Sequence, residues 1–263
     1  MSKKITLIIP VVSSSDNLAA DSKKLMGSIA KLIKFDELVG EVLVTGPKSA
    51  LSGFDKDEFG KLVLKENETD NYARLVNDAV MDVTSEYFSV LEPNDEISPA
   101  WLLNFERFEQ SNMRGDIYLY LSIARNQDGE FISFVNEIAW SSGFVDKHGF
   151  VTEQCLKAFF LFKVTGGILN TEDFISLGKL KTKLGVATWY EYLYRASMAN
   201  KQIVVIPKTA IVHHVNTEVE NTYCGGVSLD NVTDTNAWMF EASQAVAASN
   251  DDAEIVKPEE TKE

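Results

Sequence analysis

The stretch EYFSVLEPNDEISPAWL, residues 86–102, joins an apolar run to a cluster of oxygen-bearing side chains and then to the start of a helix. The apolar run is short and ends in a proline, which is typical of a buried β-strand. Four residues with carboxylate or amide oxygens follow it: Glu92, Asn94, Asp95 and Glu96. Such a cluster can form a metal-and-phosphate site, or it can be a polar turn in which Ser98 caps the next helix and Pro99 lies in its first turn.

Strands and helices alternate on the N-terminal side of this stretch. Apolar runs predict strands at residues 5–12 (ITLIIPVV), 40–46 (GEVLVTG), 61–66 (KLVLKE) and 86–93 (EYFSVLEP). An amphipathic helix capped by Ser15 or Asp16 is predicted after the first strand, and another at residues 71–85. Continuous apolar strands that alternate with helices predict an α/β fold, with a mostly parallel sheet flanked by helices.

The C-terminal half continues the alternation with fewer clear boundaries. Residues 116–135 predict two strands joined by the turn Gln127-Asp128-Gly129. The further predicted elements are a helix at 99–111, a strand, double-glycine turn and helix at 160–180, a helix at 188–200, a strand at 201–215 and an alanine-rich helix at 237–248. We expect one domain over residues 1–248, followed by an acidic disordered tail at 249–263.

The composition excludes several classes of protein. A net charge of −14 and a pI near 4.7 disfavour binding to nucleic acid or to anionic lipid, because both need a basic surface. The sequence contains no apolar stretch long enough for a membrane helix, and its N-terminus does not resemble a signal peptide, so we expect a cytoplasmic protein. Cys155 and Cys224 stand in no metal-binding spacing, which favours free thiols.

Five segments resemble, in their order along the chain, the family 2 glycosyltransferases, which have a GT-A fold. The segments are IIPVVSS (8–14), RLVNDAV (74–80), SEYFSVLEPNDEISPAWL (85–102), TGGILNTEDFISLG (165–178) and YEYLYRASMANKQIVVIPKTAIVHH (190–214). The resemblance covers residues 5–214. It implies a GT-A-like, Rossmann-related sheet and the transfer of a sugar from a nucleotide sugar to an acceptor hydroxyl.

The resemblance also implies site residues. A divalent cation, Mg²⁺ or Mn²⁺, would neutralise the diphosphate leaving group. The expected metal ligands are Glu92, Asp95 and His213. The expected nucleotide-sugar contacts are Pro10, Asn77, Asn94, Gly166 and Gly167. The nearest candidates for the catalytic base are Glu191 and Asp173.

Each of these assignments has a structural alternative. Glu191 lies four residues before Arg195, as in an ordinary helical ion pair, and Asp173 can be a first-turn acid that faces the helix dipole. Gly166 and Gly167 can approach a ligand closely or form a sharp turn. At most one of the adjacent residues His213 and His214 can face a cleft.

The chain departs from the family pattern where the chemistry is expected. Asn94 stands where a second metal-binding acid is usual, and residues 45–49 (TGPKS) replace an acidic nucleotide-binding phrase. Thr188 and Trp189 stand where an acidic pair would supply the base. Scaffold positions match and catalytic positions do not, so whether the chain is an enzyme stays open.

Two main hypotheses therefore remain. The first is a glycosyltransferase-like protein with weakened or lost sugar transfer, whose ligands are a nucleotide sugar and an unspecified acceptor. The second is a non-catalytic GT-A-fold module that binds an unspecified protein partner as a binding, inhibitory or structural-assembly protein. A third reading, an unrelated doubly wound dinucleotide-binding domain, lacks the GxGxxG motif.

Overall fold

The N-terminal half forms the predicted alternation of strands and helices in the computed structural model. Its elements are β1 (Ile5–Pro10), α1 (Leu18–Phe35), β2 (Val39–Gly46), α2 (Lys48–Leu51), β3 (Leu62–Glu66), α3 (Tyr72–Val80) and β4 (Tyr87–Val90). The four predicted strands and the two predicted helices are confirmed. The structure describes residues 5–12, 18–35, 38–52, 54, 61–126, 128–141, 147–159 and 162–214.

The C-terminal half contains more and shorter elements than predicted. They are β5 (Asp95–Ile97), α4 (Ala100–Glu109), β6 (Ile117–Tyr120), β7 (Ser122–Arg125), β8 (Phe131–Val135), η1 (Glu137–Trp140), β9 (Phe150–Val151), α5 (Glu153–Ala158), β10 (Ile168–Asn170), α6 (Thr171–Ser176), η2 (Gly185–Ala187), α7 (Thr188–Met198), β11 (Ile203–Ile206) and β12 (Ile211–His214). The predicted helix at 237–248, the domain end at 248 and the tail at 249–263 lie outside the described residues, as do the predicted cap residues Ser15 and Asp16.

Three strand predictions need correction. The run 116–126 is split by Leu121 into β6 and β7, and the run 201–215 is split by residues 207–210 into β11 and β12. In both cases the two pieces belong to different sheets. The described residues 162–165 before the double glycine are not a strand, and β10 begins after the turn, at Ile168.

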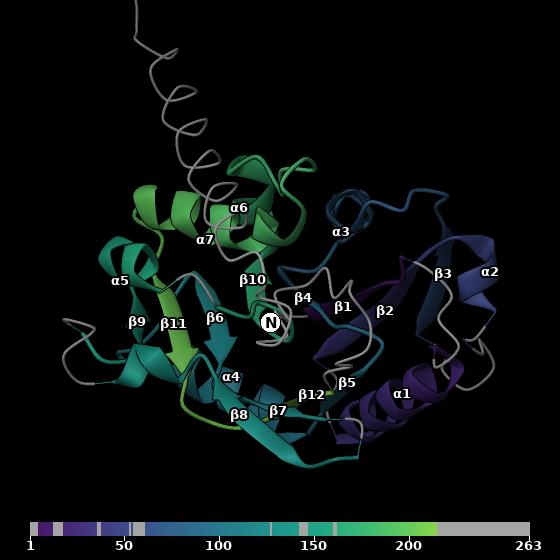
Figure 1. Ribbon diagram of the computed structural model, residues 1–263, viewed down its shortest axis with the longest axis horizontal. Coiled ribbons are helices and arrows are strands. Elements are labelled where there is room, and N and C mark those ends of the chain that lie inside the picture. The colour runs from purple at the N-terminus through teal and green to yellow at the C-terminus, as the bar shows by residue number, and fades with distance from the viewer. Residues whose placement is uncertain are drawn as a thin grey trace, which may run out of the picture.

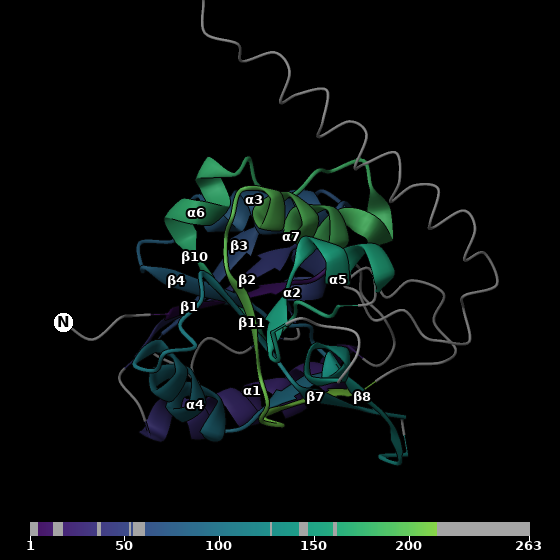
Figure 2. The ribbon, with the colours of Figure 1, turned by 90° about the vertical axis from the view of Figure 1, so that its left-hand side faces the viewer.

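The larger sheet has eight strands in the order β3-β2-β1-β4-β10-β6-β11-β9. The first four strands are parallel, β10 runs antiparallel to both of its neighbours, and β6 and β11 are parallel. Helices α3, α5, α6 and α7 cover one face, while α1, α4 and a smaller sheet cover the other (Figures 1 and 2). This is the mixed, mostly parallel α/β sheet that the sequence predicts.

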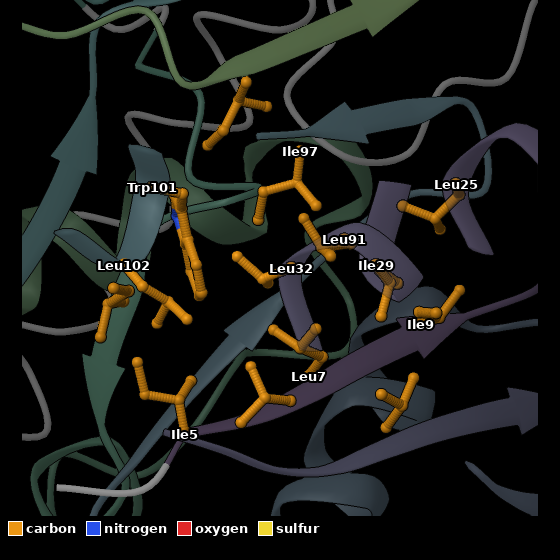
Figure 3. Close-up of a cluster of buried hydrophobic side chains, with 14 of the residues drawn as sticks. Ile5, Leu7, Ile9, Leu25, Ile29, Leu32, Leu91, Ile97, Trp101 and Leu102 are labelled. Atoms are coloured by element: carbon orange, nitrogen blue, oxygen red, sulfur yellow. The ribbon is translucent and has the colours of Figure 1, made fainter. Parts of the chain in front are cut away.

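Strand β1 shows why both faces of the sheet are covered. Its side chains alternate: Ile5, Leu7 and Ile9 enter one apolar cluster, and Ile8 enters the other. Figure 3 shows the first cluster, in which the odd-numbered residues of β1 lie near the α1 residues Leu25, Ile29 and Leu32. The mostly apolar sequence of β1 thus follows from burial on two sides.

The smaller sheet has the order β5-β12-β7-β8. Strand β12 pairs antiparallel with β5 and parallel with β7, so three segments far apart in the sequence meet there. The sheet lies on the α1 side of the large sheet, and its strand β5 contacts α1 (Figure 2). Within the described residues, no helix is both long and apolar enough to cross a membrane.

Candidate functional site

The polar cluster lies at the carboxyl end of β4. The chain leaves β4 through Leu91, whose amide donates to the Ile8 carbonyl of β1, and then turns into β5. Strand β5 pairs with β12 so that Asp95 lies opposite His213. The polar residues do gather after the end of β4, and Asp95 and His213 among them lie on strands of the smaller sheet.

Asp95 and His213 form the centre of a buried hydrogen-bonded chain. The Asp95 Oδ1 atom lies 2.7 Å from His213 Nδ1, and Asp95 Oδ2 accepts from the Glu92 amide at 2.9 Å. The other ring nitrogen, Nε2 of His213, lies 2.9 Å from the Ser122 hydroxyl of β7. Asp95 and His213 are 0% and 1% exposed, so water cannot replace these partners.

The protonation states follow from the surroundings. Burial lowers the pKa of His213, and the nearby positive charge of Lys163 lowers that pKa further, against the opposing effect of Asp95. Burial by itself would raise the pKa of Asp95, but His213, Lys163 and the Glu92 amide together bring that pKa below its usual value. We therefore assign a charged Asp95 and a neutral His213 whose Nδ1–H donates to the carboxylate and whose Nε2 accepts from Ser122.

The order Ser122–His213–Asp95 is that of a nucleophilic triad, but the burial argues for a structural role. Ser122 is 2% exposed and lies at the start of β7, inside the smaller sheet. A nucleophilic hydroxyl must reach the carbon that it attacks, and a buried hydroxyl in a sheet cannot. The chain of hydrogen bonds instead ties β5, β7 and β12 together.

Lys163 is the cation of this cluster, and the sequence analysis missed it. Its Nζ lies 3.5 Å from Glu92 Oε2, and both side chains are 5% exposed. The Lys163 backbone is fixed by Asn136, which accepts from its amide and donates to its carbonyl, at 2.9 Å each. The available signal was a lone lysine inside the apolar run FLFKVTGGIL.

The three expected metal ligands do not fit a divalent cation. Both Asp95 oxygens and both His213 ring nitrogens already have hydrogen-bond partners inside the protein. Glu92 faces the Lys163 ammonium, which would repel a bound cation. In the described part of the chain, no group of three or more His, Cys, Asp or Glu side chains is placed to hold a metal ion.

The remaining residues of the polar stretch bind the outer end of β12. The Asn94 side-chain amide donates to the His214 carbonyl, and the His214 amide donates to the Asn94 carbonyl at 3.3 Å. Glu96 Oε1 lies 2.7 Å from His214 Nε2. As predicted from strand alternation, His213 and His214 face different surroundings, and only His213 is fully buried.

Gly166 and Gly167 form a sharp turn that packs against the scaffold. Gly166 has a φ of +76°, and an added Cβ would lie 2.1 Å from the Ile211 side chain of β12. Its amide donates to the Val90 carbonyl at 2.7 Å, and its carbonyl accepts from the Trp101 indole at 2.7 Å. The close approach is therefore to β4, α4 and β12, and contact with a ligand stays a prediction.

Asn77 also holds the scaffold. Its side chain donates to the Leu180 carbonyl at 2.8 Å and accepts from the Leu180 amide at 2.9 Å, so it fixes the loop after α6. Pro10 ends β1 opposite Thr45 of β2, at the same sheet edge as the exit of β4. Of these two predicted ligand contacts, only Pro10 lies beside the polar cluster.

Both acids that were predicted as catalytic base candidates form ion pairs with positively charged side chains. The two oxygens of Glu191 accept from Arg195 at 2.7 Å each, and Glu191 is 1% exposed. Arg195 also donates to the carbonyls of Leu177 and Lys179 at the end of α6. Asp173 lies 2.6 Å from Lys201 Nζ. Glu191 thus forms the helical ion pair of its structural alternative, and Asp173 lies in the first turn of α6, as its own alternative predicts. A role of either acid as catalytic base stays a prediction.

The fold is similar to that of solved glycosyltransferase structures. The chain matches residues 1–349 of TarS from S. aureus with a TM-score of 0.58 and 17% identity, over 80% of this chain and 60% of that one. It matches the mannosyltransferase PcManGT from Pyrobaculum calidifontis, in complex with GDP-Man and Mn²⁺, with a TM-score of 0.61 and 15% identity, over 98% and 66% of the two chains. TarS 1–349 has also been solved in complex with UDP; that structure matches with a TM-score of 0.56 and 15% identity, over 81% of this chain and 60% of that one.

These similarities establish a GT-A-like α/β fold, which confirms the resemblance at the level of fold. This chain spans 60% of the TarS 1–349 chain and 37% of the longer TarS chain. No family model matches the sequence, and no curated protein sequence matches it.

Proposed function

We propose that this chain binds a nucleotide sugar at the carboxyl edge of the large sheet and transfers its sugar only weakly. The observation that carries the proposal is the location of Glu92 and Asp95 where β4 ends, in a GT-A-like sheet. In open α/β sheets, ligands bind outside the carboxyl ends of the parallel strands. TarS has been solved with UDP and PcManGT with GDP-Man, which supports a nucleoside diphosphate as the ligand class.

The exits of β1 and β4 give the proposed site its position. Ile8 and Val90 are paired across the two parallel strands, and Pro10 and Glu92 stand two residues further along each strand. Asn94 follows and is only half-buried. We assign the diphosphate to the space beside Pro10 and Asn94, where backbone groups and the Asn94 side chain can donate to phosphate oxygens.

The pairing of the acids supports weak transfer. A general base needs a carboxylate that can approach the acceptor hydroxyl, yet Glu191 and Asp173 are engaged by Arg195 and Lys201. Mg²⁺ or Mn²⁺ remains a prediction that rests on the Mn²⁺ in PcManGT. The arrangement of Glu92, Asp95 and His213 does not favour it, so no step of the proposal depends on a metal.

Isothermal titration with UDP, GDP and their hexose conjugates tests the proposal, in EDTA and again in Mn²⁺. We expect one nucleotide class to bind with a Kd between about 1 μM and about 1 mM, as is usual for substrates of enzymes. Asn94→Ala should weaken this binding, and Glu130→Ala on the exposed β7–β8 hairpin is the matched control. Absence of binding to every nucleotide sugar, with and without Mn²⁺, would reject the proposal.

A second candidate is the non-catalytic module, and the paired acids favour it specifically. If the chain only binds, incubation with its nucleotide sugar should release no nucleoside diphosphate above the buffer blank. Nucleotide release that stops in Asn94→Ala would decide for transfer. Binding with no release would decide for the module.

A further inference from the structure

We propose that the buried ammonium of Lys163 takes the place of the divalent cation, so that this chain binds its diphosphate ligand without a metal. The part of this inference that concerns the ligand rests on the proposed function. The part that concerns the cation rests on the chain's own side chains. The residues do not fit the expected divalent cation, and the proposal assigns the role of that cation to Lys163.

The position of Lys163 relative to the three expected ligands is the first argument. Its Nζ lies 3.5 Å from Glu92 Oε2. Glu92 is joined to Asp95 through its backbone amide, and Asp95 contacts His213. The ammonium therefore lies against the hydrogen-bonded group that contains all three side chains assigned to the metal from the sequence.

The charge balance is the second argument. Glu92 and Asp95 are buried acids, and buried carboxylates need a compensating positive charge. Lys163, whose Nζ lies 3.5 Å from Glu92 Oε2, supplies such a charge within the cluster. A divalent cation beside it would meet a like charge and a histidine whose two nitrogens are already engaged.

The rigidity of Lys163 is the third argument. Asn136 binds its amide and its carbonyl and also donates to the Tyr120 carbonyl at 2.9 Å, so the segment is joined to the end of β6. Phe162 and Val164 on either side are buried. Asn136 therefore fixes the backbone position from which the Lys163 side chain extends toward Glu92.

Electron paramagnetic resonance of Mn²⁺ measures cation binding without any nucleotide. The wild-type protein should leave millimolar Mn²⁺ free. Lys163→Met removes the ammonium and keeps Glu92 and Asp95, so it should bind Mn²⁺ at least about tenfold more tightly, since hard carboxylate oxygens suit this ion. Mn²⁺ should also raise the melting temperature of that variant alone. Lys208→Met removes an exposed lysine of the β11–β12 loop and should behave as wild type.

Tight, stoichiometric Mn²⁺ binding by the wild-type protein would overturn the proposal, and so would a folded Lys163→Met variant that gains no affinity. If that variant does not fold, the wild-type nucleotide titration decides. Equal affinity in EDTA and in Mn²⁺ supports the assignment, and a tenfold gain with Mn²⁺ overturns it. If no nucleotide binds at all, the proposed function fails, while the Mn²⁺ measurement on the wild type still tests Lys163.

Discussion

At the scale of single residues, the buried acids of the candidate site, Glu92 and Asp95, are paired with basic side chains of the same chain. The chain joins Asp95 to His213 across 118 residues, and Lys163 joins the same cluster. Such pairings could not be predicted from the sequence, because nothing near Asp95 indicates which distant residue will face it. The sequence predicted that oxygens gather at the end of β4, and the structure adds that their partners are side chains and backbone groups of the protein itself.

The Glu92–Lys163 pair gives a prediction about stability. Lys163→Met should lower the free energy of unfolding by about 3–5 kcal/mol, because it removes the ammonium that faces the buried Glu92 carboxylate. The double variant Glu92→Gln/Lys163→Met should lose less than the sum of the two single variants, because it removes both charges. Urea denaturation of the four proteins measures this coupling. Additive losses would show that the two side chains do not interact.

His213 gives a prediction about pH. Its pKa is lowered in the folded state by burial, so the unfolded chain binds a proton that the folded protein does not. Stability should therefore be complete above about pH 6.5 and fall as the pH decreases below it. The lowered pKa of Asp95 has the same sign and adds a second loss below about pH 3.8.

Urea midpoints between pH 8 and pH 5 test this prediction for His213. His213→Gln should lower the midpoint at pH 8 and flatten its decline toward pH 5. His214→Gln is the matched control on the same strand, and it should keep the wild-type pH profile. An unchanged slope in His213→Gln would assign the decline to another group.

At the scale of elements, continuous apolar runs were predictable and breaks inside them were not. Strands β1 and β4 are buried on both faces, so their apolar sequences identify them. The run LYLSIAR contains no glycine or proline, yet the chain passes from one sheet to the other at Leu121. Pro207 lies in the other break, between β11 and β12, but the predicted strand at 201–215 runs through it. The smaller sheet, which carries Asp95, Ser122 and His213 of the candidate site, therefore could not be predicted from the sequence.

The double-glycine turn before β10 gives a prediction at this scale. Gly166→Ala should destabilise the protein by about 2–4 kcal/mol, because alanine is strained at positive φ and its Cβ would overlap Ile211. Gly27→Ala in α1 is the control; its Cβ would have no neighbour within 4 Å, and it should stabilise the helix by up to about 1 kcal/mol. Chemical denaturation measures the free energy of unfolding of both variants. An unchanged free energy of unfolding in Gly166→Ala would contradict the described turn.

At the scale of the whole molecule, acidity and fold have separate consequences. The three-layer arrangement follows from strands that are apolar on both faces, as the sequence predicted, and it would hold at many net charges (Figure 1). The net charge of −14 instead implies self-repulsion in the compact state. This repulsion is spread over the surface, so it is screened by salt, whereas the buried cluster around Lys163 is not.

Salt should therefore stabilise the protein in a way that depends on ionic strength and not on the identity of the cation. Raising NaCl from about 0.02 M to about 0.5 M should raise the melting temperature by a few degrees, because the Debye length falls well below the size of the molecule. MgCl₂ at the same ionic strength should give the same increase within about 1 °C, since Lys163 already fills the place of a specific divalent ion. Differential scanning calorimetry measures both series. If MgCl₂ raises the melting temperature more than NaCl does, and the difference disappears in Glu92→Gln, a cation is bound at the end of β4. If the difference persists in Glu92→Gln, Mg²⁺ binds only to the acidic surface.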